Sequence, residues 1–309
     1  MDVITAISEL LPELSRTQQR IAKFIIGNPD AVCFYTLKTF SKTVNASEAT
    51  ILGFCAKTEY KTFAGVRDAL KEYLQRRLFW NDKLEMSADQ YSADESTFNS
   101  LKKLHAESVE ETLDQLNYRA LEAFVEALDN AGRIYIAGHG VSRTIAKFYE
   151  DKLGDTGADA VLVDVTDYGA VLKALAHYRQ EDVFILITLP FYSAQTVAIG
   201  EYLDSVGATV LAVTDKITSP IVKNARATLL CRSDALVFHN SVASCVALAD
   251  ILSSMLILKD KERFRNYNEK TKEIEGYFRS QAIPAYTNEY FYTDLSGLGP
   301  EIKEENRCI

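Results

Sequence analysis

The spacing of apolar residues divides the chain into a first part that is helical throughout and a second part in which strands alternate with helices. Over residues 3–78 the apolar positions recur with the period of an amphipathic helix. A helix over 16–26 ends at Gly27-Asn28-Pro29, a combination that stops helices. Further helices are expected from about Asp30 and over 36–43, 47–57 and 63–78. Because the connections are short, these helices must pack as a compact bundle.

Beyond residue 130, short apolar segments alternate with helical ones of about 12–18 residues. The expected strands are Arg133–Ala137, Ala160–Val165, Val183–Thr188, Thr209–Thr214 and Ala227–Leu230. This alternation predicts an α/β fold with a five-stranded parallel sheet flanked by helices. Ligands of such sheets bind at the carboxyl ends of the strands. Here those ends carry 138–142, 164–168, 188–196 and 214–215.

We therefore expect four parts: a helical domain over 1–80, a polar linker over 81–99, an α/β domain over 100–280 and a tail over 281–309. An amphipathic helical stretch covers 100–130. The helix expected over 241–258 is apolar on most of its surface. A helix of that kind is buried, so we expect it at a subunit interface.

Composition is that of an ordinary globular protein, with 47% hydrophobic and 25% charged residues. No apolar run approaches the ~20 residues of a membrane span, and the first residues lack the features of a secretory signal. The five cysteines are scattered, which favours reduced thiols in a cytoplasm. The four histidines have no metal-ligand spacing, so we expect neither a metal site nor a cofactor.

The net charge of −9 is unevenly distributed. Residues 1–80 hold 11 Lys and Arg against 8 Asp and Glu, whereas the rest of the chain holds 23 against 35. Because screening confines electric fields to ~10 Å, a locally basic domain of an acidic protein can still bind DNA.

The segment 36–51 has the length and turn chemistry of a helix-turn-helix motif. Thr36 and Ser47 are suitable N-caps, and the turn Val44-Asn45-Ala46 places Asn where a left-handed residue is needed. Any small helical bundle also contains a helix, a tight turn and another helix, so spacing alone leaves DNA binding open.

The segment 134–142 predicts a strand that runs through a glycine turn into a helix N-terminus, where anions bind. Gly138-His139-Gly140 could begin a dinucleotide-binding fingerprint, but Arg143 stands where the third glycine belongs. A nicotinamide cofactor is therefore disfavoured.

Taken together, the runs 14–29, 47–51, 54–55 and 61–63 resemble the N-terminal domain of the RpiR family. These are bacterial regulators of sugar metabolism in which a winged-type helix-turn-helix domain is followed by a sugar isomerase (SIS) domain. The resemblance covers roughly residues 3–260, with both halves in the family's order. It implies a helix-turn-helix domain joined to a SIS domain.

Two arginines of the family's recognition helix are replaced here by Gly53 and Ala56. Guanidinium groups are the best partners for guanine edges and phosphates, so their loss puts operator sequence and affinity in question. The residues left for DNA contact are Ser47, Thr50 and Lys57 on the second helix, with Lys38, Lys42 and Lys61 for phosphates. Each lysine could equally be a solvated surface charge.

The resemblance also implies a ligand site at two loops. The family's Gly-x-Gly-x-Ser turn matches here at 138–142, and 190–196 resembles a variant loop, Pro-x-Tyr-Ser-x-x-Thr, in which Phe191 replaces an arginine and Gln195 a glutamate. Ser193 and Thr196 could instead only cap the next helix. The expected ligand residues are Gly138, His139, Gly140, Ser142, Tyr192, Ser193, Thr196 and His239, the last of them across a dimer.

These features predict a cytoplasmic transcriptional regulator that binds operator DNA and senses a sugar phosphate or related sugar metabolite. We expect a homodimer or homotetramer, no membrane partner and no catalytic residues, because nothing matches the acid–base set of a sugar isomerase. Two alternatives remain at this stage: a SIS-type sugar-phosphate isomerase with an appended helical domain, and a ligand sensor that has lost DNA binding.

Overall fold

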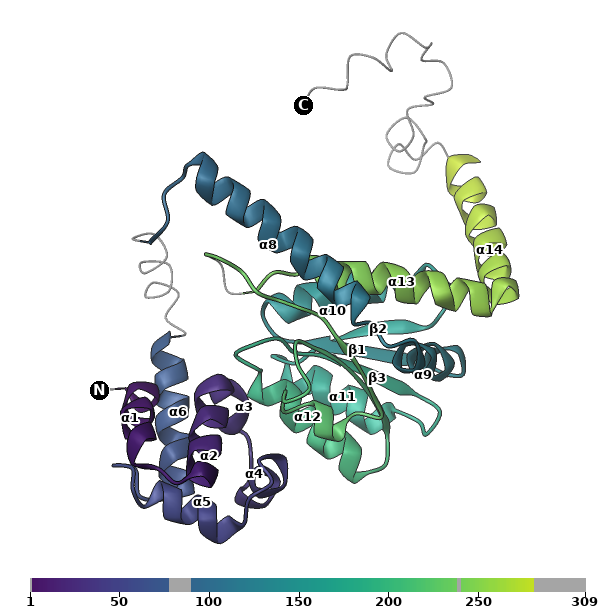
Figure 1. The fold of residues 1–309 in the computed structure, drawn as a ribbon. Coiled ribbons are helices and arrows are strands. Elements are labelled where there is room, and N and C mark those ends of the chain that lie inside the picture. The colour runs from purple at the N-terminus through teal and green to yellow at the C-terminus, as the bar shows by residue number, and fades with distance from the viewer. Residues whose placement is uncertain (1, 78–89, 238–239, 281–309) are drawn as a thin grey trace. The chain divides into compact units, whose positions relative to one another are not determined.

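The computed structural model describes residues 2–77, 90–237 and 240–280. Contacts divide the chain into a large unit, 1–259, and a small one, 260–309. Within the large unit we call residues 2–77 the helical domain and the described residues of 90–259 the sheet domain (Figure 1). His239, Cys308, residues 81–89 of the predicted linker and the predicted tail lie outside the described residues.

The helical domain packs its helices around one apolar core. Its elements are α1 (Val3–Leu10), η1 (Leu11–Glu13), α2 (Arg16–Gly27), α3 (Pro29–Val32), α4 (Leu37–Thr43), α5 (Glu48–Cys55) and α6 (Phe63–Arg77). At the centre, the rings of Phe40 and Phe63 stack with centroids 5.1 Å apart. No strand occurs in residues 2–77. The wing of the winged-type motif is therefore absent from this described segment, because Lys61, with a φ of 62°, turns the chain directly into α6.

Helices α4 and α5 form the predicted helix-turn-helix. Thr36 and Ser47 cap them, accepting hydrogen bonds from the amides of Thr39 at 3.1 Å and Thr50 at 3.2 Å. Asn45 between them has a φ of 47°, the left-handed conformation expected from the sequence.

The sheet domain is built on five parallel strands. They are β1 (Ile134–Gly138), β2 (Ala160–Asp164), β3 (Val183–Ile187), β4 (Thr209–Thr214) and β5 (Ala227–Leu230). Their order across the sheet is β2-β1-β3-β4-β5, with every neighbouring pair parallel. The predicted α/β fold with five parallel strands is confirmed.

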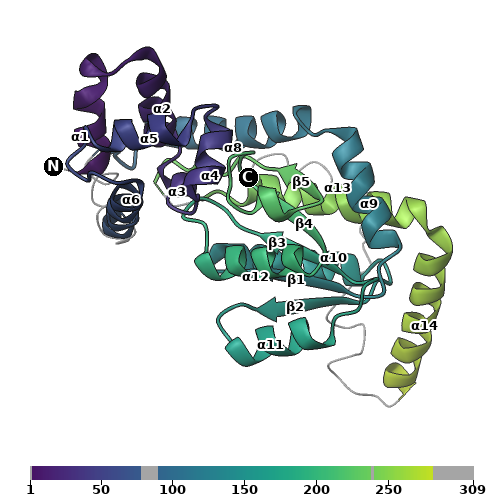
Figure 2. The same ribbon diagram turned by 90° about the horizontal axis from the view of Figure 1, so that it is seen from below.

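Helices cover both faces of this sheet, as Figures 1 and 2 show. They are α8 (Glu95–Asp114), α9 (Tyr118–Asp129), α10 (Val141–Gly154), α11 (Tyr168–His177), α12 (Ala194–Ser205), η2 (Val222–Asn224) and α13 (Ala243–Lys259). Alternate strand residues face opposite sides: Ile136 and Ile185 pack with α9, α10 and α13, whereas Tyr135 and Phe184 pack on the side of α11 and α12. The central strands β1 and β3 are buried throughout, as their continuous apolar sequences indicate, whereas the edge strands β2 and β5 are partly exposed.

The first residue of α8 and the packing of α13 are details that the sequence pattern does not predict. Helix α8 begins at Glu95, inside the stretch assigned to the linker, because the Asp94 carboxylate accepts from the Thr97 amide at 2.8 Å. Most of the apolar surface of α13 is buried within its own domain against α8, α9 and α10. Its expected place at a subunit interface stays a prediction.

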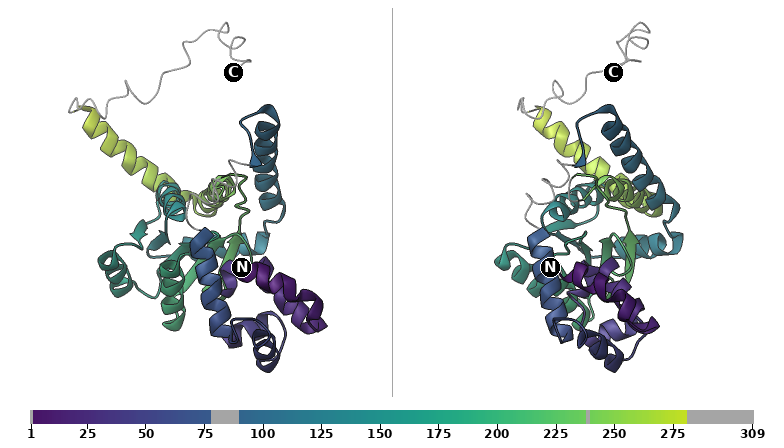
Figure 3. Two further views of the ribbon diagram at one scale, coloured as in Figure 1. Left: turned by 90° about the vertical axis from the view of Figure 1, so that its left-hand side faces the viewer. Right: turned by 60° about the vertical axis from the view of Figure 1, so that its left-hand side comes forward.

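The small unit contains α14 (Lys261–Ser280), the helix seen in yellow-green in Figure 3. Most of its described side chains are exposed, as its charge-rich sequence predicts.

Gly53 offers a direct test of the recognition helix. A Cβ atom at this position would meet no atom within 4 Å, so Gly53→Ala should remove backbone entropy from the unfolded chain without a clash. We expect stabilisation by about 0.5–1 kcal/mol, measured by urea denaturation. Gly138→Ala is the opposite control, since its Cβ would lie 2.5 Å from the Ser142 carbonyl oxygen and must destabilise. Equal stability of the two variants would contradict the described backbone.

Candidate functional site

The turn after β1 brings four predicted ligand residues around the first turn of α10. Gly138 approaches α10 too closely for any side chain. Gly140, the N-cap of α10, has a φ of 57°, which glycine adopts without strain. The Ser142 amide donates to the His139 carbonyl oxygen over 3.1 Å. Ser142 is buried at this helix N-terminus, whereas His139 is exposed.

The loop after β3 supplies the second predicted element. Ser193 caps α12, and its Oγ accepts a hydrogen bond from the Thr196 amide at 3.2 Å. Capping is the role that the sequence offers for Ser193 as an alternative to ligand binding. The Ser193 amide in turn donates to the Thr188 Oγ1 at 3.3 Å. Thr196 is fully buried, and its Oγ1 has no hydrogen-bond partner among the described residues. Buried hydroxyls are nearly always paired, so this one is an exception within the described part of the chain.

These two loops meet at the point where the strand order reverses. Gly138 lies opposite Ile187 in the register of β1 and β3. From β1 the chain moves to β2 on one side, and β3, β4 and β5 follow on the other. In open α/β sheets, ligands bind outside the carboxyl ends of the strands at such a reversal.

Tyr192, also predicted to bind ligand, extends from the loop after β3 into the apolar core of the helical domain. It is 3% exposed and packs in the same apolar cluster as Phe40. Its hydroxyl donates to the Asp215 carboxylate over 2.7 Å. The structure therefore places Tyr192 in a contact between domains.

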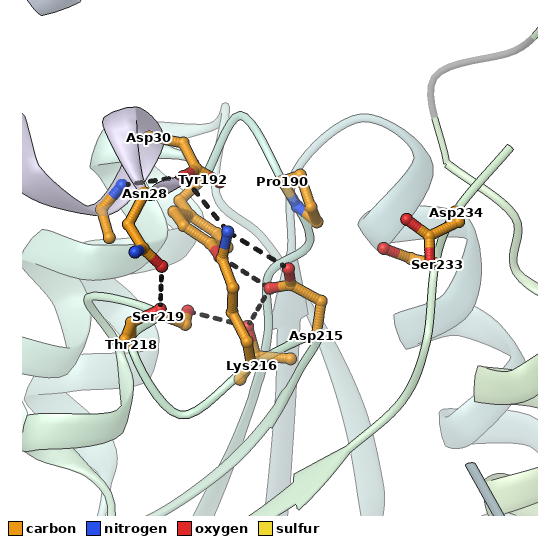
Figure 4. A network of polar contacts seen from close by, with 12 residues as sticks. Asn28, Asp30, Pro190, Tyr192, Asp215, Lys216, Thr218, Ser219, Ser233 and Asp234 are labelled. Carbon is orange, nitrogen blue, oxygen red and sulfur yellow. Dashed lines mark hydrogen bonds and ion pairs between the residues drawn. The ribbon is translucent and has the colours of Figure 1, made fainter. Parts of the chain in front are cut away.

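A set of polar contacts surrounds Tyr192 and joins the helical domain to the segment after β4 (Figure 4). Lys216 Nζ lies 3.4 Å from the Asp30 carboxylate and 4.0 Å from that of Asp215. Thr218 is held twice: its Oγ1 donates to the side-chain oxygen of Asn28 at 2.9 Å, and its carbonyl accepts from the Tyr35 hydroxyl at 2.6 Å. The helix stop after α2 thus contacts the carboxyl end of the sheet.

Burial governs the electrostatics of this contact. Desolvation raises the pKa of the Asp215 carboxyl, while the Tyr192 hydrogen bond and the Lys216 charge act in the opposite direction. Burial, with the charges of Asp30 and Asp215, raises the pKa of the Tyr192 hydroxyl, which is therefore the proton donor of the pair. Sequence analysis missed Asp30 and Lys216, although Asp215 had been noted at a strand end.

Beside this contact lies a cavity of about 410 Å³ at the carboxyl ends of β3, β4 and β5. Pro190 and Phe191 line it from the loop after β3, Asp215 and Lys216 from the end of β4, and residues 232–235 and 240 from the segment after β5. In Figure 4, Ser233 and Asp234 lie across from Pro190 and Asp215. A volume of this size suits a small molecule.

The exposed face of α5 carries little charge. Its exposed residues are Glu48, Ala49, Leu52, Gly53 and, just beyond the helix, Ala56 and Lys57. The hydroxyls of Ser47 and Thr50 lie 2.8 Å apart at the cap. Lys57 Nζ donates to Gln18 Oε1 on α2 at 3.1 Å, so it is not a free cation.

Other cations surround this helix. Lys38, Lys42 and Lys61 are exposed on the helical domain, as their predicted role requires. Arg20, which the sequence analysis did not single out, donates from Nη2 to the carbonyl of Asn45 at 2.7 Å. This hydrogen bond fixes a guanidinium beside the helix-turn-helix turn.

Among the described residues, no group of three or more His, Cys, Asp or Glu side chains is arranged to hold a metal ion. Within the same part of the chain, no helix has the length and apolarity needed to cross a bilayer.

Two protein-family models match the chain. The helix-turn-helix domain of the rpiR family matches residues 1–77, and the SIS domain matches residues 127–258. The chain is also similar to two helix-turn-helix-type transcriptional regulators. One, from Caldanaerobacter subterraneus subsp. tengcongensis, is 25% identical over 88% of this chain and 96% of its own length. The other, from Haemophilus influenzae, is 27% identical over 72% of this chain and 77% of its own.

Two solved structures share the fold. The Vibrio vulnificus NanR protein, complexed with ManNAc-6P, aligns over 88% of this chain and 97% of its own with a TM-score of 0.59 and 18% identity. The sugar isomerase domain of an RpiR transcription factor from Sphaerobacter thermophilus aligns over 56% of this chain and 97% of its own, with a TM-score of 0.54 and 23% identity.

The Asp30–Lys216 pair should contribute measurably to the contact between domains. The Asp30 and Lys216 side chains are 10% and 33% exposed, so solvent screens their attraction only in part. In a double-mutant cycle with Asp30→Asn and Lys216→Met, we expect a coupling free energy of about 1 kcal/mol in urea denaturation.

The matched control is Glu201 and Lys223, an ion pair at 2.8 Å within the sheet domain whose side chains are 51% and 33% exposed. Its coupling should be about 0.5 kcal/mol or less. A smaller coupling for Asp30 and Lys216 than for this control would argue against the described contact.

Proposed function

We propose that this chain, whose two parts match the rpiR-family helix-turn-helix model and the SIS-domain model, is a transcriptional regulator of the RpiR type that binds operator DNA through α5 and responds to a sugar phosphate or related sugar metabolite. The observation that carries the proposal is the contact of Asn28, Asp30 and Tyr35 with the segment 216–218. It joins the DNA-binding domain to the edge of the sheet where ligands bind. A ligand at that edge can therefore affect the placement of α5.

The proposed ligand site lies at the carboxyl ends of β1 and β3. Its groups are the buried Ser142, the N-terminus of α10 with Gly138, His139 and Gly140, and the loop residues Ser193 and Thr196. Amides at a helix N-terminus suit the oxygens of an anion. The sugar phosphate bound to the structurally similar NanR supports the same ligand class here.

Regulation requires that the ligand bind two arrangements of the helical domain with different affinity, since equal affinity shifts nothing. The contact around Lys216 represents one of those arrangements. We propose a cytoplasmic homo-oligomer, because helix-turn-helix proteins bind two half-sites related by a two-fold axis.

On the DNA side, we propose that Ser47, Thr50 and Lys57 lie in the major groove and that Lys38, Lys42, Lys61 and Arg20 contact phosphates. The exposed Ala49 and Leu52 add apolar surface that can meet thymine methyl groups. With Gly53 and Ala56 where the family has arginines, each protomer offers two fewer cations to DNA. Affinity and its dependence on salt should therefore both be lower than they would be with the two arginines present.

Restoring the charges tests the orientation of α5. Gly53→Arg and Ala56→Arg should each strengthen DNA binding and steepen the dependence of log K on log salt by about 1, if each guanidinium reaches a phosphate. Fluorescence anisotropy with fragments from the chain's own genome measures both quantities. Gly154→Arg, at another position with no atom within 4 Å, adds the same charge far from α5 in sequence and fold.

Equal effects of Gly53→Arg and Gly154→Arg would show that α5 does not face DNA. Retention of no fragment by wild-type protein or either variant, together with aldose–ketose turnover, would favour a SIS-type isomerase. Retention of no fragment without turnover would favour a sensor that acts through protein partners.

The proposed ligand site is tested by thermal shift with a panel of sugar phosphates that includes ManNAc-6P. A ligand at about 100 times its Kd should stabilise the protein by about 2.7 kcal/mol. Ser142→Ala removes the hydroxyl and should reduce the shift, whereas Ser205→Ala, on the exposed end of α12, should not. An undiminished shift in Ser142→Ala would place the ligand elsewhere.

A further inference from the structure

The cavity of about 410 Å³ beside Lys216 has a different lining from the ligand site proposed between β1 and β3. None of the predicted ligand residues within the described chain lines it. Its walls come from the loops after β3, β4 and β5, so it lies at the same edge of the sheet as that proposed site. The chemistry of its lining identifies what it can hold.

Charge in this cavity is balanced and already paired. Arg232 bonds Asp234 at 2.6 Å and Glu111 at 2.5 Å. Lys216 lies between Asp30 and Asp215. The lining thus holds two cations and two carboxylates, and each cation also pairs with a carboxylate outside the lining, Asp30 or Glu111. A phosphate group here would meet like charges and would have to displace a carboxylate from its cation.

The uncharged residues of the lining also indicate which kind of ligand fits the cavity. Ser233 and Asn240 add a hydroxyl and an amide, and the Asn240 Nδ2 donates to the Pro190 carbonyl at 3.2 Å. Carboxylates offer several acceptor positions each, which suit the O–H donors of a polyol. Pro190, Phe191 and Ala235 supply an apolar wall for the C–H side of such a molecule.

We propose that this cavity is a second ligand site, which binds an uncharged polyhydroxylated molecule of monosaccharide size, a free sugar or an alditol. Asp215 and Asp234 accept hydrogen bonds from its hydroxyl groups, and the ring of Phe191 covers its apolar face. Phosphorylated sugars bind more weakly, because both cations of the lining are already paired with carboxylates.

Three residues of the cavity also hold the two domains together. Lys216 binds Asp30, Asp215 accepts from Tyr192, and Phe191 packs against the apolar core of the helical domain. An occupant therefore touches the same side chains that fix the DNA-binding domain. This part of the inference rests on the proposed function, whereas binding itself does not.

The test uses the full chain and measures binding directly. Saturation-transfer NMR with mixtures of aldohexoses, aldopentoses and alditols identifies ligands, and calorimetry gives their Kd. The same sugars as 6-phosphates form the second arm. We expect saturable binding of at least one free sugar or alditol and at least tenfold weaker binding of its 6-phosphate in this cavity.

Two variants locate the site. Phe191 has a φ of 68°, so Phe191→Gly removes the ring while relieving backbone strain, and it should raise the Kd at least tenfold. Asp234→Ala, at a carboxylate whose side chain is 61% exposed, should raise it at least fivefold. Glu201→Ala, at a carboxylate on α12 that is also paired and half exposed, should leave the Kd unchanged. Melting temperatures confirm that each variant is folded.

Absence of binding by every free sugar and alditol would overturn the proposal, as would binding that survives both cavity variants. Binding only of the 6-phosphates, lost in Ser142→Ala, would also overturn it while leaving the proposed function intact. Binding of a free sugar with no effect of any ligand on DNA affinity would support the second site and count against ligand control of DNA binding.

Discussion

The parallel direction of all five strands is the constraint on which the other features depend. Because every strand points the same way, every loop that leaves a carboxyl end emerges at one edge of the sheet. That edge carries the turn of Ser142, the loop of Phe191 and the segment of Lys216, and the helical domain contacts it. The loops at this edge and the helical domain are therefore neighbours for a topological reason, and the proposed signalling between them would need no long path through the core.

Most of the fold could be predicted because its signals are local. Each strand is a short apolar run bounded by polar residues, and the predicted strands match the observed ones within one residue at either end. The left-handed conformation of Asn45 and the end of α2 at Gly27 could also be predicted, since both follow from backbone sterics. The start of α8 was missed because Asp94 is one acidic residue in a polar stretch, and nothing local distinguishes a capping carboxylate from a solvated one.

The candidate site was predictable only where one loop defines it. Gly138 and Ser142 belong to a single turn, and Ser193 showed its capping role by its position before a helix. Tyr192 was assigned to the ligand because it stands in the same loop, yet its partner Asp215 comes from another strand. The Asp30–Lys216 pair spans 186 positions, and no periodicity or motif reports contacts at that separation. A site formed by several loops can therefore be identified from the structure but not from the sequence alone.

The distance along the chain has a consequence for synthesis. The residues of the helical domain make mostly local contacts, and domains of that kind fold quickly. Thr218, which holds Tyr35, is translated 183 residues after it. At 5–20 residues per second, roughly 10–40 s separate the two on the ribosome. During that interval the helical domain of the nascent chain lacks its hydrogen bond to Thr218. The contact between the two domains can form only after β4 and the segment that follows it have left the ribosome.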